Sequence, residues 1–357
     1  MATPRLHSKF TTIYSKLFQG QSPANQDADQ FFSNLLTLDI NRDFLVTEIS
    51  RIPTQSFLGP LKPTVNTLFH TLLLRARSDS DLTRRGNAFE TLIILTRCLL
   101  SKNLSGYEIM EIFAGVLVDS DSPGVFIHVP SKQFTKSPTA TIRHQALQLA
   151  LVFMCGVGQL SPGAYFLRTD LFPSLVTFIK NPSTSQYTFE AILLLAILAN
   201  FHKSDAGKLN PYLQKIKECS DAEFMRKICW ASGFALETAI KAYQEIHNDE
   251  PAPAFSTTLG SLFAAMRPDR ALASTPVDPP KELFKDQPIE ACVILLPIYE
   301  FLRANTTFSS VFLEVHPGRR NRPEPDIEHD SYTVVLHPNT CNNDLLTPVV
   351  SVRELGS

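Results

Sequence analysis

The stretch Phe189–Phe201 reads FEAILLLAILANF, and it decides the fold class expected for this chain of 357 residues. Its apolar run, Ala191–Ala199, has nine residues, whereas a helix needs about 20 to cross a bilayer. A helix that is apolar on every side is typical of one buried by several neighbours. We therefore expect a core helix packed among other helices. The alternative is that Ala191–Phe201 enters a membrane.

Apolar residues recur at helical spacing on both sides of this stretch. Positions three and four residues apart form stripes that predict about fourteen amphipathic helices joined by turns. Two such stripes consist of Phe10, Ile13, Tyr14, Leu17 and Phe18, and of Val65, Leu68, Phe69, Leu72 and Leu73. The pattern predicts an all-α fold of armadillo/HEAT-like stacked helices, an α-solenoid. No strict repeat of about 40 residues is visible, so a single globular helical domain is the structural alternative.

The helical pattern divides the chain into three parts. An armadillo-like helical domain is expected over residues 5–317, with a mobile Pro-rich loop at 267–287 inside it. Ile289–Leu302 is expected to be another buried helix. Residues 318–357 are expected to be a disordered tail, because they show no apolar stripe. Tyr332–Leu336 could form a short strand there, but we identify no partner strand for it.

The composition excludes several classes of protein. The chain has 33 Lys and Arg against 35 Asp and Glu, a formal net charge of -2, so the basic excess of a general nucleic-acid binder is missing. The six cysteines form no CxxC pair, and the histidines show no metal-ligand spacing. No phosphate-binding glycine loop, nucleophile elbow or zinc-protease motif occurs. We therefore expect no enzymatic activity, no catalytic or metal-ligating residues and no cofactor.

Polar residues that follow the apolar stretch are the candidates for partner binding. Asn200 and His202 lie at the end of the expected helix, and Asn210 and Tyr212 come shortly afterwards. An asparagine in such a place can bond the backbone of a partner peptide, as in armadillo grooves. The alternative is structural, with Asn200 at the C-terminus of one helix and Asn210 capping the next.

The N-terminal segment offers a possible membrane contact. Its expected helix is basic on the polar side, and no acidic residue precedes Asp27. Such a helix could lie on an anionic membrane or act as a transit peptide. The alternative is that it caps one end of the helical array.

Several segments are similar to those of a known family. Phe189–Leu213, with Asn200 followed by an aromatic and basic residues and then Asn-Pro-Tyr at 210–212, resembles the family of armadillo-like helical domain-containing protein 3. Further similar segments follow the same order along the chain: residues 13–18, 31–45, 87–92, 170–182 and 290–317, the last with Asn305-x-x-Phe308. The resemblance covers roughly residues 5–317.

This resemblance implies more than the residues alone show. It implies an armadillo-like fold without catalytic activity, in a cytosolic protein that works at Golgi membranes. It also implies roles in phosphatidylinositol 4-phosphate supply and secretion, with phosphatidylinositol 4-kinase beta and a large Arf guanine-nucleotide exchange factor as partners. Family chains continue into a second helical domain, which we expect to be absent here.

Overall fold

The computed structural model describes nine parts of the chain, most of them helical. They are residues 8–21, 28–114, 139–156, 167, 169–201, 210–248, 295–315, 332–336 and 350–354. The Pro-rich loop expected at 267–287 lies outside them, as does most of the expected tail.

Seven helices form the first half of the described structure. They are α1 (Lys9–Phe18), α2 (Ala28–Leu35), α3 (Arg42–Arg51), α4 (Thr54–Leu58), α5 (Lys62–Ser78), α6 (Leu82–Leu100) and α7 (Gly106–Ala114). Side-chain caps define where several of them begin. Ser8, Asn41 and Asp81 each accept a hydrogen bond from a backbone N–H in the first turn of the helix that follows.

The second half continues with helices and one pair of strands. The helices are α9 (Ala140–Gly156), α11 (Phe172–Lys180), the 3-10 helix η1 (Pro182–Tyr187), α12 (Thr188–Asn200), α13 (Pro211–Glu218), α14 (Ala222–Asn248), α17 (Leu295–Ala304) and α18 (Thr306–Val315). Prolines occupy the first turns of α5, α11 and α13, where the missing N–H leaves no helical hydrogen bond unmade.

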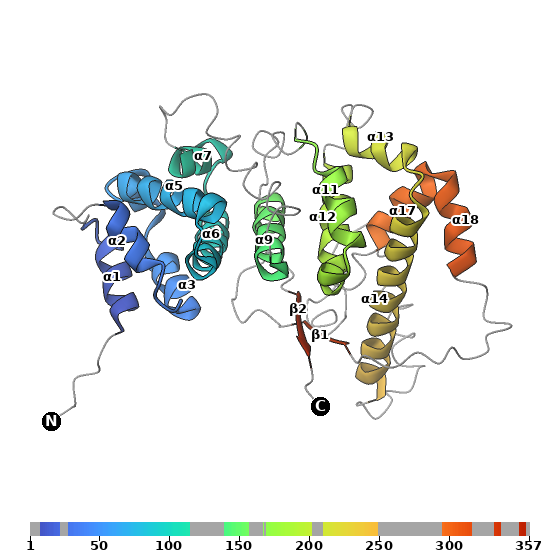
Figure 1. The fold of residues 1–357 in the computed structure, drawn as a ribbon. Coiled ribbons are helices and arrows are strands. Elements are labelled where there is room, and N and C mark those ends of the chain that lie inside the picture. Colours follow the sequence, from blue (N-terminus) through green and yellow to red (C-terminus); the bar gives the residue numbers. More distant parts are fainter. Residues whose placement is uncertain are drawn as a thin grey trace, which may run out of the picture.

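The helices stand side by side in a row that runs from α1 to α18 (Figure 1). Within it α5 packs on α6, α6 on α9, α9 on α12, α12 on α14 and α14 on α18. Their buried apolar side chains form one continuous core along the row. Because each helix packs mainly on its neighbours, the described helices have the stacked arrangement of an armadillo-like array. The prediction of an all-α, stacked-helix fold is confirmed for this helical region.

Helix α12, which contains the apolar stretch, lies inside that core. Ten of its thirteen residues are buried, among them Glu190 in its first turn. It packs against α9, α11, α14 and α17 on different sides, which explains why no side of it is polar. The alternative that Ala191–Phe201 enters a membrane is therefore wrong, because the protein itself covers this segment. Among the described residues no helix has the length and apolar character to span a bilayer.

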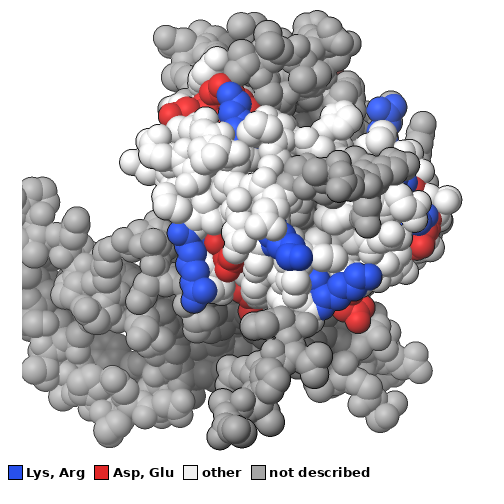
Figure 2. All heavy atoms as spheres, turned by 90° about the vertical axis from the view of Figure 1, so that its left-hand side faces the viewer, with Lys and Arg blue, Asp and Glu red and all other residues white. Residues whose placement is uncertain are grey.

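Helix α1 lies at one end of the row (Figure 1). Its apolar residues Phe10, Tyr14, Leu17 and Phe18 are buried, and it packs on α3. Burial raises the pKa of Tyr14 to about 12. The apolar face that would enter a membrane is thus occupied within the fold. On this side of the molecule the described charges are scattered, with blue and red side chains close to one another and no large area of one sign (Figure 2).

The expected C-terminal tail contains a strand pair. Tyr332–Leu336 (β1) pairs antiparallel with Val350–Glu354 (β2), so that Tyr332 lies opposite Glu354 and Leu336 opposite Val350. The expectation that β1 has no partner is wrong. The partner follows 14 residues after β1 and starts with its own apolar alternation, Val350-Ser-Val, which is the pattern of a strand.

Candidate partner-binding site

Asn210 joins two consecutive helices through its side chain. Its Oδ1 accepts a hydrogen bond from the Tyr212 N–H at 2.9 Å, which caps the start of α13. Its Nδ2 donates to the carbonyl oxygens of Leu198, Ala199 and Phe201 at 2.9, 3.2 and 3.1 Å, which satisfies the end of α12. Asn210 is 5% exposed, so these bonds are made away from water.

Tyr212 fixes α13 to the start of α11. Its buried hydroxyl donates to the Thr169 carbonyl oxygen at 2.7 Å and accepts from the Leu171 N–H at 3.2 Å. Burial raises the pKa of Tyr212, so the phenol keeps the proton it donates. An ion pair between Lys215 and Asp170, with an Nζ–Oδ2 distance of 2.7 Å, joins the same two elements on the outside.

The other two candidate residues differ from this pair. The Asn200 side chain is half-buried and donates to the Ala196 carbonyl oxygen of its own helix at 2.9 Å. His202 lies outside the described residues. Asn210 and Tyr212 therefore form one connected junction of α11, α12 and α13, and Asn200 stands beside it. A role of the four residues in partner binding stays a prediction.

Asn305, directly before α18, repeats the arrangement of Asn210. Its Oδ1 accepts from the Phe308 N–H at 2.8 Å and caps α18. Its Nδ2 donates to the carbonyl oxygens of Ile216 and Cys219 at 2.7 and 2.8 Å, at the end of α13. Asn305-x-x-Phe308 belongs to the segments that carry the resemblance, but this structural role was not predicted from it. The available signal was an asparagine placed directly before an apolar helical stripe.

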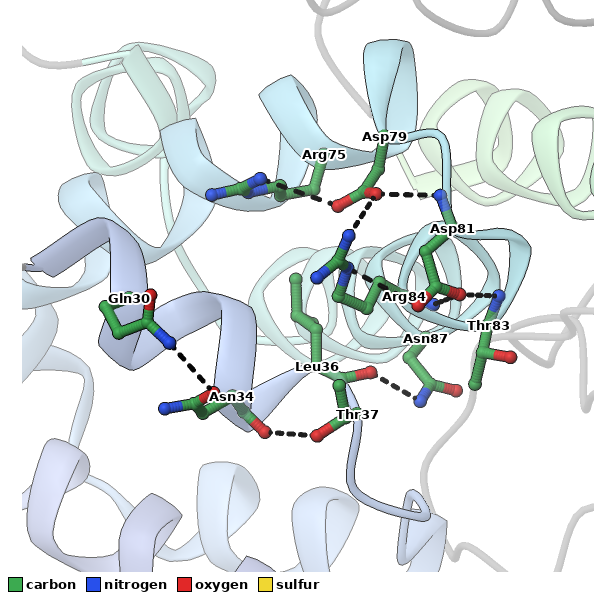
Figure 3. A network of polar contacts seen from close by, with 10 residues as sticks. All are labelled: Gln30, Asn34, Leu36, Thr37, Arg75, Asp79, Asp81, Thr83, Arg84 and Asn87. Carbon is green, nitrogen blue, oxygen red and sulfur yellow. Dashed lines mark hydrogen bonds and ion pairs between the residues drawn. The ribbon is translucent and has the colours of Figure 1, made fainter.

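A third polar junction lies between α2, α5 and α6 (Figure 3). The Asn87 Nδ2 donates to the carbonyl oxygens of Leu36 and Leu38 at 2.8 and 3.1 Å, at the end of α2. Close by, the Asp79 Oδ1 accepts from Arg84 at 3.0 Å and from the Asp81 N–H at 2.9 Å. Asparagine side chains thus satisfy helix ends at three separate places along the row.

The electrostatics of Asp79 keep it ionised at this junction. Its side chain is 2% exposed, and this burial alone would raise the pKa. The hydrogen bond from the Asp81 N–H, the Arg84 guanidinium and the nearby Arg75 outweigh burial, so the pKa of Asp79 is lowered. The carboxylate therefore contributes to stability as an anion.

The outer face of α17 has a different character. Four large apolar residues there are 41–57% exposed: Leu295, Leu296, Tyr299 and Leu302. The opposite side of the helix is buried, with Phe301 at 0%. Of the buried helix expected over Ile289–Leu302, residues 289–294 lie outside the described part of the chain, and the expectation is wrong for the four exposed residues of α17. The pattern misled because an apolar stripe looks the same whether the protein covers it or not.

A shallow depression of about 280 Å³ lies next to this face. It is lined by Asn210, Leu213, Gln214, Lys217, Arg303 and Ala304. The Arg303 guanidinium lies 5.9 Å from the centre of the Tyr299 ring, which connects the depression to the apolar face. Arg303 also bonds the buried Glu300 at 2.8 Å, and this carboxylate raises the pKa of Arg303.

Other groups of ionisable residues have structural roles. Ser105 and Glu108 cap α7 reciprocally, with Glu108 Oε2 accepting from the Ser105 N–H at 2.7 Å. His144 on α9 lies 2.8 Å from Glu190 on α12, and its ring stacks on Tyr187. Within the described ranges no three His, Cys, Asp or Glu side chains are placed to hold a metal ion.

Comparison with known proteins gives one consistent result. The chain is 22% identical over 321 residues to "Armadillo-like helical domain-containing protein 3" from Danio rerio and from Homo sapiens, and 22% identical over 325 residues to that from Xenopus laevis. Each alignment covers 87% of this chain. The chain is similar to armadillo-like helical domain-containing protein 3. The resemblance inferred from Asn200–Tyr212 and the other segments is thereby confirmed.

The comparison has defined limits. The chain covers 44% of the length of each of these three relatives. No family model and no solved structure matches it. The name of armadillo-like helical domain-containing protein 3 describes the helical architecture found here, and arrays of this kind suggest protein-interaction scaffolds.

Proposed function

We propose that this chain is a non-enzymatic scaffold that binds partner proteins through its stacked helices. The observation that carries the proposal is that α14 and α17 each leave large apolar side chains exposed within an armadillo-like array. On α14, Trp230 is half exposed and stacks on Phe234, with ring centres 6.2 Å apart. On α17 the apolar face is exposed over the whole helix. Contiguous exposed apolar surface typically marks an interaction site.

The resemblance supports a finer version of this proposal. In it the scaffold works in the cytosol and at Golgi membranes, where it helps to recruit phosphatidylinositol 4-kinase beta and a large Arf guanine-nucleotide exchange factor for secretion. Its contact with the membrane is then peripheral and indirect, made through those partners. This agrees with the buried apolar face of α1, which leaves no amphipathic surface there to enter lipid.

Affinity purification of the tagged chain from its own cells, followed by mass spectrometry, tests the scaffold function. We expect the kinase or the exchange factor to be enriched over a tagged control protein of similar size. The proposal would be contradicted if no specific protein is recovered although circular dichroism shows that the chain is folded. Recovery of other, reproducible partners would support a scaffold and overturn the finer version.

Carbonate extraction of Golgi membranes tests the kind of membrane contact. A protein bound through partners is released into the supernatant at alkaline pH. We therefore expect the chain in the supernatant, together with peripheral control proteins. Retention in the pellet beside integral control proteins would contradict an indirect contact.

A further inference from the structure

The exposed residues of α17 form one continuous strip along the helix. Leu295, Tyr299 and Leu302 follow the spacing i, i+4, i+7, which places them on one face, and Leu296 borders them. We call these four residues the α17 strip. Single exposed apolar residues are ordinary on protein surfaces, but four on a helix of ten residues are not. The strip lies on the side of α17 opposite the buried Phe301.

Positive charge borders the α17 strip at the adjacent depression. Lys217 and Arg303 both line it, and among the described residues no acidic side chain does. Lys217 is exposed and, within the described part of the chain, forms no ion pair. Arg303 is 52% exposed and pairs with the buried Glu300 at 2.8 Å, so part of its charge is offset inside the fold. A partner group that enters the depression therefore meets Lys217, the exposed edge of Arg303 and Gln214, whose amide donates to Glu218.

We propose that the α17 strip and the adjacent depression bind an acidic amphipathic helix of a partner protein. This inference rests on the proposed scaffold function and names its surface. The strip extends over about 10 Å, from Leu295 to Leu302, which matches two turns of a partner helix with apolar residues at i, i+3 or i+4, and i+7. An Asp or Glu at the edge of that partner helix enters the depression between Lys217 and Arg303.

Charge favours this occupant over a second copy of the chain. In a two-fold dimer each copy presents the same surface, so two sets of Lys217 and Arg303 would share one interface. Like charges in such an interface disfavour association. An acidic partner helix instead supplies the complementary charge, while its apolar face covers the strip.

Site-specific photo-crosslinking in cells tests the proposal with the full chain. Tyr299 is replaced by the photoreactive amino acid p-benzoylphenylalanine, and crosslinked peptides are sequenced by mass spectrometry. We expect peptides with apolar residues at helical spacing and a net negative charge. The control carries the same amino acid at Leu74, which is similarly exposed on α5 at the opposite end of the row. It should give none of these peptides.

Two further variants separate the apolar and the ionic contribution. Leu302→Ser removes part of the strip and should lower the crosslinking yield at Tyr299 by about tenfold, as expected for a central apolar contact. Lys217→Glu reverses the charge at the edge and should lower it by about fivefold. Leu74→Ser is the matched control and should leave the yield unchanged.

The possible outcomes distinguish this inference from the scaffold function. Crosslinks to a second copy, to lipid, to basic peptides or to nothing overturn the inference. It is also overturned if Leu302→Ser leaves the yield unchanged. If partners are still recovered by affinity purification in those cases, the scaffold function stands and another surface carries it. If no partner is recovered at all, the scaffold function itself fails.

Discussion

The junction of α12 and α13 and the α17 strip adjoin the same depression, but they use their side chains in opposite ways. Asn210 directs both ends of its amide into the fold and satisfies two helix ends. Leu302, on the α17 strip, presents its side chain to solvent next to Arg303. Asn210, which the sequence offers as a candidate for partner binding, has a structural role in the fold, whereas Leu302, expected in a buried helix, is exposed. In a helical array, a polar residue next to an apolar helix can thus mark a helix end as well as a partner site.

The largest effect on stability should distinguish the buried side of α17 from its exposed side. Phe301→Ala removes a ring that is 0% exposed and packs against Phe224 and Phe308, and we expect a loss of about 3–5 kcal/mol in the free energy of unfolding. Leu302→Ser, at the adjacent position on the strip, should change it by less than about 0.5 kcal/mol. Urea denaturation followed by circular dichroism measures both. Equal losses would mean that the strip is part of the core.

The second effect concerns the amide of Asn210. Asn210→Ala removes the cap of α13 and leaves the carbonyl oxygens at the end of α12 unpaired in a buried place, so we expect a loss of about 2–4 kcal/mol. The matched variant is Asn200→Ala, which breaks a single bond to the same helix and should cost less than about 1 kcal/mol. The same urea titration compares them. Similar losses would contradict the role of Asn210 in bonding the ends of both α12 and α13.

These two residues also show how much the sequence could predict. The helices on either side of Asn210 follow from apolar spacing, because burial on one face is encoded locally. A capping role for Asn210 was one of two interpretations of the sequence. Its bonds to the α12 carbonyl groups could not be predicted, because they depend on how α12 and α13 pack. Nothing in residues 295–302 distinguishes an exposed strip from a buried one, since that depends on which distant helix covers it. The pairing of β1 with β2 required a contact across 13 intervening residues.

A smaller effect is expected for the hydroxyl of Tyr212. Tyr212→Phe keeps the buried ring but leaves the Leu171 N–H and the Thr169 carbonyl oxygen without this partner, so we expect a loss of about 1–2 kcal/mol. Hydrogen exchange at the Leu171 amide should accelerate as well, because that amide loses its acceptor. Tyr107→Phe, at a residue that is 70% exposed, is the control and should leave stability unchanged. An unaltered Leu171 exchange rate would contradict the bond.

The smallest effect should appear only in acid. The pKa of Asp79 is lowered in the fold, so its ionised form adds stability above the pKa of the unfolded chain, about 3.9. That contribution is lost as the pH falls through the lower pKa of the folded state. Thermal unfolding from pH 7 to pH 2 should therefore show that wild type and Asp79→Asn converge at the acid end. Parallel curves would mean that Asp79 titrates alike in both states.

The buried hydrogen bonds of the Asn305 side chain have a consequence for covalent modification. Asn305, Thr306 and Thr307 form the sequence accepted for N-glycosylation, in which the sugar bonds to the asparagine Nδ2. In the folded chain that atom donates to the carbonyl oxygens of Ile216 and Cys219, and Asn305 is 3% exposed. A glycan could be attached only before the Asn305 side chain bonds the end of α13. A sugar found on Asn305 would therefore mean that glycosylation took place before this end of the array had folded.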